Sequence, residues 1–139
     1  MPSPYCRQHG LSVLAYSLLA QGLLTGKFGP EHQFEPGDHR AQNKLFQGDH
    51  FQRALKAVGE LRPIAERHGC TLTQLALAWL IAQPNVHAIT GARNAEQAQA
   101  NAQAAQVQLS PAELDEVDAI GWQVSDRLED TPIMWDFAA

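Results

Sequence analysis

The sequence predicts an α/β fold in which a few parallel strands are covered by helices. Two short segments, residues 11–16 and 86–90, are dominated by Leu, Val, Ala and Ile, as is typical of strands buried on both faces. Helical patterns separate them, and this order favours a right-handed parallel crossover. Because only two strands are evident and their outer edges would be open, we expect a portion of a larger α/β fold.

Composition limits the classes of function. The 139 residues are 45% hydrophobic, which is enough for one packed core. The net charge of −5 argues against a binder of nucleic acid or of a membrane surface. No segment is apolar for long enough to cross a bilayer, and residues 1–10 lack the apolar run of a signal peptide. Cys6 and Cys70 are far apart and have no metal-ligand spacing, so free thiols are favoured over a disulfide. We therefore expect a soluble, cytoplasmic protein.

The first half of the chain is expected to hold one strand and two loops. Residues 1–9 form a polar lead-in, and the strand at 11–16 follows. Residues 17–29 are a loop with three glycines, and residues 30–48 lack periodicity, which indicates an excursion on the surface. The excursion includes His32, and Gly-Asp-His recurs at 37–39 and 48–50. A metal site is conceivable there, but a polar loop with a coincidental repeat is favoured.

Two helices are predicted between the strands. Residues 50–68 carry apolar residues at helical spacing, with Pro63 expected to kink or divide the helix. Thr71 and Gln74 form a capping box before a second helix at 72–82, which is apolar almost all round and ends before Pro84. The residues expected to be buried are Leu75, Leu77, Trp79, Leu80 and Ile81, with Leu14 and Ile89 on the strands.

Two further helices are predicted after the second strand. Asn94 caps a helix that extends to about residue 106. Ser110 and Glu113 form a second capping box, with Pro111 at the first helical position, and this last helix is expected to end at Gly121. The predicted division is therefore a folded part, 1–121, and a C-terminal tail, 122–139, which carries two of the three tryptophans.

Two motifs carry the functional prediction. Residues 13–28 (VLAYSLLAQGLLTGKF) and 86–101 (VHAITGARNAEQAQAN) each run from a strand into a loop. Because the carboxyl ends of parallel strands meet at one edge, the loops together could hold a phosphorylated dinucleotide. The segment GLLTGKF is no nucleoside-triphosphate loop, since three residues separate its glycines and Phe28 follows the lysine. Taken alone, GARNAEQ favours an ordinary strand, turn and capped helix with Arg93 in solvent, and the phosphate role is favoured only together with the earlier loop.

These motifs, together with LALAWLIAQPNV between them, resemble the C-terminal part of the aldo/keto reductases. These are NADP-dependent oxidoreductases built on an eight-stranded (β/α) barrel, and the likeness covers residues 4–120. It is greatest to the branch with bacterial general-stress reductases and potassium-channel β subunits. The resemblance implies a partial (β/α)8 TIM barrel, its C-terminal portion, with two parallel strands and a predominantly helical core in residues 1–121.

The resemblance also implies roles for individual residues toward NADP. Tyr16 matches the aromatic residue that stacks on the nicotinamide, and Arg40 matches an arginine that folds over the cofactor. The loop that wraps the pyrophosphate, with glycine geometry and amides aimed at the phosphates, is matched by Ser17, Leu19, Ala20, Gly22, Thr25 and Lys27. The turn after the eighth strand and the adenosine end are matched by Gly91, Arg93, Gln97 and Asn101. There Arg93 suits the 2′-phosphate that separates NADP from NAD.

Three departures from the family pattern are evident. Leu18 stands where the family usually has Pro, and Ala100 stands where it often has Glu. The family's catalytic Asp, Tyr, Lys and His lie in the N-terminal half of the barrel, and no residue here matches them. A complete barrel needs about 250 residues. We therefore assign no catalytic residue and no metal, and expect a cofactor-binding part that catalyses nothing alone.

Two alternatives remain open. The chain could be an interaction or complementing subunit, whose open strand edges are covered by another copy or by a separate N-terminal fragment. It could also be a relic with no retained role. The expected partner is therefore NADP(H), with a homo-oligomer or an N-terminal complementing fragment possible under the first alternative.

Overall fold

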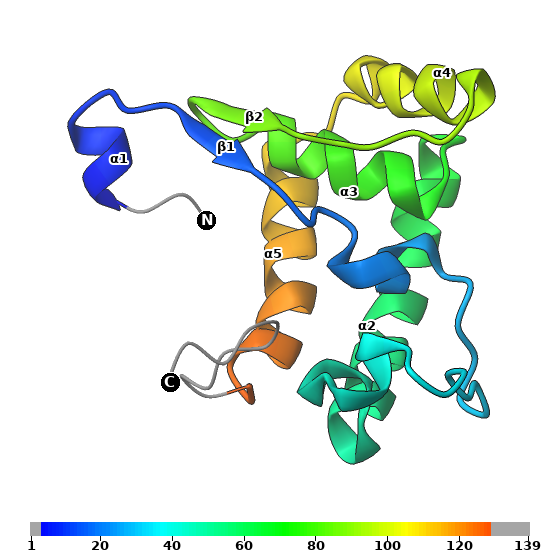
Figure 1. Cartoon of the computed structure of the whole chain (residues 1–139). Helices are drawn as coiled ribbons and strands as arrows, with labels where there is room; N and C mark the ends of the chain where they lie inside the picture. The colour runs from blue at the N-terminus through cyan, green and yellow to red at the C-terminus, as the bar shows by residue number, and fades with distance from the viewer. Residues whose placement is uncertain (1–3, 129–139) are drawn as a thin grey trace.

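The computed structural model describes residues 4–128 (Figure 1). Five α-helices, two strands and four 3-10 segments occur among these residues. In chain order they are α1 (Pro4–Gln8), β1 (Val13–Ala15), η1 (Ala20–Thr25), η2 (His39–Gln42), η3 (Lys44–Phe46), α2 (Gly48–Arg67), α3 (Leu72–Ile81), β2 (Val86–Ala88), α4 (Ala95–Gln103), η4 (Ala104–Gln106) and α5 (Pro111–Ser125).

The two strands pair in parallel, as predicted. Val13 lies opposite Val86 and Ala15 opposite Ala88, and the Ile89 amide donates a hydrogen bond of 2.9 Å to the Ala15 carbonyl. Helix α3 packs against β2, beneath the sheet in Figure 1. The pair of strands with helices on one side is the architecture expected of part of a (β/α) barrel.

The other face of the sheet is open, which makes part of the burial prediction wrong. Leu14 is 63% exposed and Ile89 is 56% exposed, although both were expected to be buried. Successive strand residues point to opposite faces, and among the described residues helices cover only the face that carries Val86. A strand that is apolar on both faces therefore has one face in solvent here.

The core is mainly helical, as predicted. Helix α2 runs beside α5 and also contacts α3 (Figure 1). Ile64 and Leu75 are the largest fully buried side chains of the described residues, one from α2 and one from α3. The capping boxes predicted at Thr71 and Ser110 are both present, and Asn94 accepts the amide of Gln97.

Helix α3 is buried less completely than its composition indicates. Leu75 and Leu77 are buried as predicted. Trp79 and Leu80 are only half-buried, and Ile81 is 39% exposed, so their predicted burial is wrong. The indole of Trp79 instead donates a hydrogen bond of 2.9 Å to Asp118 on α5.

Three predicted boundaries also differ from the structure. Helix α2 is not divided at Pro63, because the following Ile64 and Ala65 are 0% and 3% exposed in the core and hold the next turn in place. Helix α5 continues through Gly121 to Ser125, and Leu128 is buried behind it. Residues 4–8 form α1 rather than an irregular lead-in, and residues 129–139 of the predicted tail lie outside the described residues.

The segment 30–48 is not wholly a surface excursion. Leu45 and Phe46 of η3 belong to the hydrophobic core, and Asn43 before them is 7% exposed. The Asn43 side chain accepts the Leu45 amide at 2.9 Å, which caps η3 and lets the apolar pair turn inward.

Candidate functional site

A groove of about 230 Å³ lies where the carboxyl ends of β1 and β2 meet. One wall is the loop after β1 and the other is the loop after β2, about seventy residues later. Its lining residues are Ser17, Leu18, Leu19, Gln21, Gly22, Ile89, Thr90 and Gly91. The groove thus brings together four of the predicted residues, Ser17, Leu19, Gly22 and Gly91, from both motifs.

The loop after β1 has an unusual backbone. Ser17, Ala20 and Gln21 have φ values of 55°, 46° and 56°, and Gly22 and Gly26 have 95° and 71°. Left-handed geometry costs a non-glycine residue about 1–2 kcal/mol, so three such residues within five positions are held there by their surroundings. Backbone of this kind gathers at ligand-binding loops.

Internal hydrogen bonds fix this loop. The Ala20 amide donates to the Ser17 carbonyl at 3.0 Å, and the Gly22 amide donates to the Leu19 carbonyl at 2.9 Å. The Thr25 hydroxyl donates to the Gly22 carbonyl at 2.7 Å. Turn formation therefore already uses the amides of Ala20 and Gly22 as donors, and the expectation that loop amides point at phosphates stays a prediction. Ala20 and Thr25 shape the groove without lining it.

Lys27 lies beside the groove. A methyl group added to Gly22 would lie 3.2 Å from the Lys27 Cε and 3.3 Å from its Nζ. Among the described residues, no carboxylate is within ion-pair distance of this ammonium group. The positive charge is therefore next to a residue of the groove wall and is not neutralised by a neighbouring acid.

Arg40, by contrast, is held away from the groove lining. Its Nε donates to Asp38 at 2.9 Å, and its guanidinium lies over the rings of Phe28 and Phe34. The hydrogen bond from the Arg40 side chain lowers the pKa of Asp38 from 3.8 to about 2. Arg40 thus has an ion-pair partner already.

The second wall is tied to helix α4 by two amide side chains. Gln97 accepts the backbone amide of Arg93 at 2.9 Å. Asn101 donates to the Thr90 hydroxyl at 3.2 Å and to the Gly91 carbonyl at 3.1 Å. The predicted pair therefore supports the loop that lines the groove, while the side-chain nitrogen of Gln97 and the side-chain oxygen of Asn101 take no part in these bonds.

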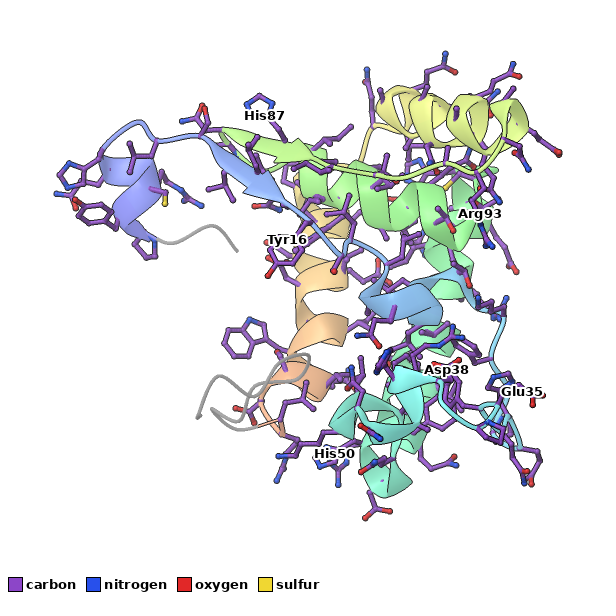
Figure 2. All side chains as sticks on the ribbon, viewed as in Figure 1. Tyr16, Glu35, Asp38, His50, His87 and Arg93 are labelled. Carbon is purple, nitrogen blue, oxygen red and sulfur yellow. The ribbon has the colours of Figure 1, made fainter. Side chains whose placement is uncertain are left out.

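Arg93 and Tyr16 are both accessible. The Arg93 side chain is exposed and makes no ion pair with any described residue. Tyr16 is 68% exposed and immediately precedes Ser17 of the groove (Figure 2). Neither side chain lines the groove itself.

Sequence reasoning missed several contributors. Gln21, Ile89 and Thr90 line the groove, and the buried Asn43 donates to the Gln21 side chain at 3.3 Å. An Asn before an apolar pair is a capping signal, but nothing in the sequence indicates a contact with a loop 22 residues earlier.

Other site types have little support in residues 4–128. No three His, Cys, Asp or Glu side chains gather there in a way that could hold a metal ion. Within the same residues, no helix has both the length and the apolar character needed to cross a membrane. A larger hollow of about 490 Å³ is lined by residues of α2 and the end of α5, but by none of the predicted site residues.

Comparison with protein families gives one match, the Aldo/keto reductase family, over residues 2–121. The chain is 44% identical to an uncharacterized oxidoreductase of Mycobacterium tuberculosis over 107 residues, which are 77% of this chain and 32% of that protein. It is 36% identical to the NADH-specific methylglyoxal reductase of Escherichia coli, over 79% of this chain and 33% of that enzyme. A probable voltage-gated potassium channel subunit beta of Arabidopsis thaliana is 36% identical over 84% of this chain and 37% of its own length.

Among solved structures, the glycerol dehydrogenase of Gluconobacter oxydans is similar, with a TM-score of 0.80 and 32% identity. The match covers 98% of this chain and 40% of that enzyme. The chain therefore spans about a third of the length of the curated relatives it matches.

Proposed function

Because the chain belongs to the aldo/keto reductase family, we propose that its groove binds the diphosphate and adenosine parts of NADP(H). The chain is then the cofactor-binding C-terminal part of a nicotinamide-dependent carbonyl reductase. One observation carries the proposal: Ser17–Gly22 and Ile89–Gly91, far apart in sequence, border the same groove at the carboxyl ends of neighbouring parallel strands. In open α/β folds and barrels, ligands bind at that end of the strands.

The residues around the groove suit the chemistry of a dinucleotide. Lys27 brings an unneutralised positive charge to the groove wall, which favours a diphosphate. Asn101 and Gln97 keep hydrogen-bonding capacity for the adenosine end. The exposed ring of Tyr16 offers a flat apolar face for the nicotinamide. When bound, the cofactor supplies the hydride for carbonyl reduction.

Arg93 is the residue proposed to select NADP over NAD. An exposed guanidinium without an ion-pair partner among the described residues can bind a phosphate through two parallel hydrogen bonds. The E. coli relative is named as NADH-specific, so the preference of this chain needs its own measurement.

The test is a titration of the folded chain with NADPH and with NADH, followed by cofactor fluorescence. We expect saturable NADPH binding below millimolar concentration. Arg93→Ala should weaken NADPH binding about tenfold or more, since a charged hydrogen bond contributes about 1.5–3 kcal/mol, and should leave NADH binding unchanged. Arg53→Ala, an exposed arginine on α2, is the matched control. A folded protein that binds no NADPH at millimolar concentration refutes the proposal.

We also propose that these 139 residues alone bind the cofactor without reducing a carbonyl. The support is the resemblance itself, which assigns the catalytic Asp, Tyr, Lys and His to a part of the barrel that these residues do not match. Reduction of a simple aryl aldehyde by the purified chain with NADPH would contradict this.

A cytoplasmic location is proposed because the two cysteines, Cys6 and Cys70, are unpaired and NADPH is an intracellular cofactor.

A second candidate function is that of an interaction or complementing subunit. It is favoured by the exposed apolar face of the sheet and by the outer edges of β1 and β2, which pair with no other described strand. Another copy or a separate N-terminal fragment could cover these surfaces. Sedimentation velocity distinguishes the two functions: a monomer at all concentrations with a cooperative melt speaks against an assembling subunit. If Arg93→Ala changes neither stability nor the NADPH response, the chain is better described as a relic.

A further inference from the structure

An aromatic cluster that includes Phe28 lies next to Gly22 of the groove lining. Phe28 is 8% exposed, and its ring meets Phe34 and Phe46 edge-on with centroid separations of 5.5 and 5.6 Å. Phe46 in turn contacts Phe51 of α2 at 5.8 Å. The ring of Phe28 is therefore fixed in the core by neighbours on two sides, and it cannot move freely.

Two cationic side chains, Lys27 and Arg40, contact the ring of Phe28. The Nζ of Lys27 lies 4.9 Å from the ring centroid, and the Cζ of Arg40 lies 5.5 Å from it. These distances are within the range of cation–π attraction. The charge of Arg40 is neutralised by Asp38, whereas Lys27 has no acidic partner among the described residues. Phe28 is thus the aromatic partner of a lysine whose charge remains available to a ligand.

The same contact places the Lys27 ammonium beside the groove. The Lys27 ammonium group is close to Gly22, since a methyl group added there would be only 3.3 Å from Nζ. Gly22 lines the groove. A free lysine side chain has four rotatable bonds and loses rotamer entropy when it is fixed. A ring that already holds the lysine in place reduces that cost on binding.

We propose that Phe28 is a positioning residue, which holds the Lys27 ammonium beside Gly22 where it meets the diphosphate of the ligand. This inference rests on the proposed cofactor function and adds to it a residue that does not touch the ligand. Phe28 would then contribute to ligand binding as well as to the packing of the core.

The test is a double-mutant cycle on Phe28 and Lys27, with NADPH affinity as the readout. Phe28→Leu should weaken NADPH binding about two- to fivefold, the size of a partly exposed cation–π contact. In the Lys27→Ala background the same change should have no further effect, because the group that Phe28 positions is gone. Phe28→Tyr keeps the ring face and should restore affinity.

Phe51→Leu is the matched control. Phe51 is as buried as Phe28 and belongs to the same core, but its ring contacts Phe46 rather than Phe28, and no cation from residues 4–128 lies over it. It should leave NADPH affinity unchanged in both backgrounds. Equal effects of Phe28→Leu with and without Lys27, or equal effects of Phe28→Leu and Phe51→Leu, overturn the inference.

A measurement on the unmodified protein covers the case in which Phe28→Leu does not fold. The ring current of Phe28 should shift the Lys27 ε-proton resonances upfield from their random-coil position in the absence of ligand. Random-coil values for these protons overturn the inference. The proposed function fails separately, if the unmodified chain does not bind NADPH at all.

Discussion

Gly26 is the position where a single added carbon matters most to the groove loop. It has φ of 71°, and an added Cβ would lie 2.5 Å from the Leu72 Cδ1 and 3.0 Å from an Arg62 guanidinium nitrogen. Arg62 also donates to the Gly26 carbonyl at 3.1 Å. The loop is therefore fastened to α2 and α3 at this glycine.

We expect Gly26→Ala to reduce the free energy of unfolding by about 2–4 kcal/mol, as left-handed strain and overpacking add. The control is Gly37→Ala, which has φ of 88° but open space around the added carbon, and should cost only about 1–2 kcal/mol. Urea unfolding measures both. Equal losses for the two variants would mean that the overlap between the added methyl group and Leu72 does not add to the destabilisation.

At the scale of elements, the carboxylate of Glu113 joins the end of α2 to the start of α5. Glu113 accepts from the Ser110 amide and hydroxyl in the capping box, and its other oxygen lies 2.8 Å from His68 at the end of α2. Hydrogen bonds from Ser110, followed by the bond to His68, lower the pKa of Glu113 from 4.5 to about 2.

This pKa shift predicts a pH dependence. Because the folded pKa is below the unfolded value, the stabilisation from Glu113 is complete above pH 4.5 and is lost as the pH falls from 4.5 toward 2. Glu113→Gln retains a capping side chain but cannot ionise. Between pH 5 and 2 its unfolding free energy should therefore fall less steeply than that of the unmodified protein.

Asp115→Asn is the control for this measurement, since Asp115 is on the same helix and makes no ion pair within residues 4–128. The remaining acid dependence in Glu113→Gln should include that of Asp38, whose pKa is also lowered. If the unfolding free energy of Glu113→Gln falls with pH as steeply as that of the unmodified protein, Glu113 does not contribute to the acid dependence of stability.

The sequence predicted helix starts better than helix ends or burial. Thr71, Asn94 and Ser110 cap helices as expected because a cap and its partner are three residues apart. The end of α5 depends instead on how Val124 and Leu128 pack against the core. The glycine at 121, which predicted an earlier end, carries no information about this packing. Similarly, Asn43 reaches the groove through a contact that no local pattern encodes.

The site was predictable only in part. Both loops of the groove follow strands, so their meeting could be expected from parallel pairing alone. The internal use of the Ala20 and Gly22 amides, and the pairing of Arg40 with Asp38, depend on three-dimensional geometry that the motifs do not specify.

At the scale of the whole molecule, the uncovered face of the sheet is the most unusual feature. Leu14 and Ile89 are more than half exposed, while Val86 on the other face is 7% exposed. Exposed apolar groups gathered on one face favour association. The same face would point into the interior of a complete barrel, where the relatives' additional length is available to cover it.

We expect the double variant Leu14→Ser, Ile89→Ser to be nearly as stable as the unmodified chain, within about 0.5 kcal/mol per site. It should associate less in sedimentation velocity, because less apolar surface is available. Val86→Ser, on the covered face, should instead destabilise by about 2 kcal/mol or more. Unchanged association in the double variant would exclude this face as the contact.

The groove itself is tested most directly by following backbone amide resonances of the folded chain during an NADPH titration. We expect the amides of residues 17–22 and 89–91 to shift together, with one dissociation constant, since both loops line one binding site. Shifts confined to one loop, or none in either while the spectrum remains that of a folded protein, would contradict a shared cofactor groove.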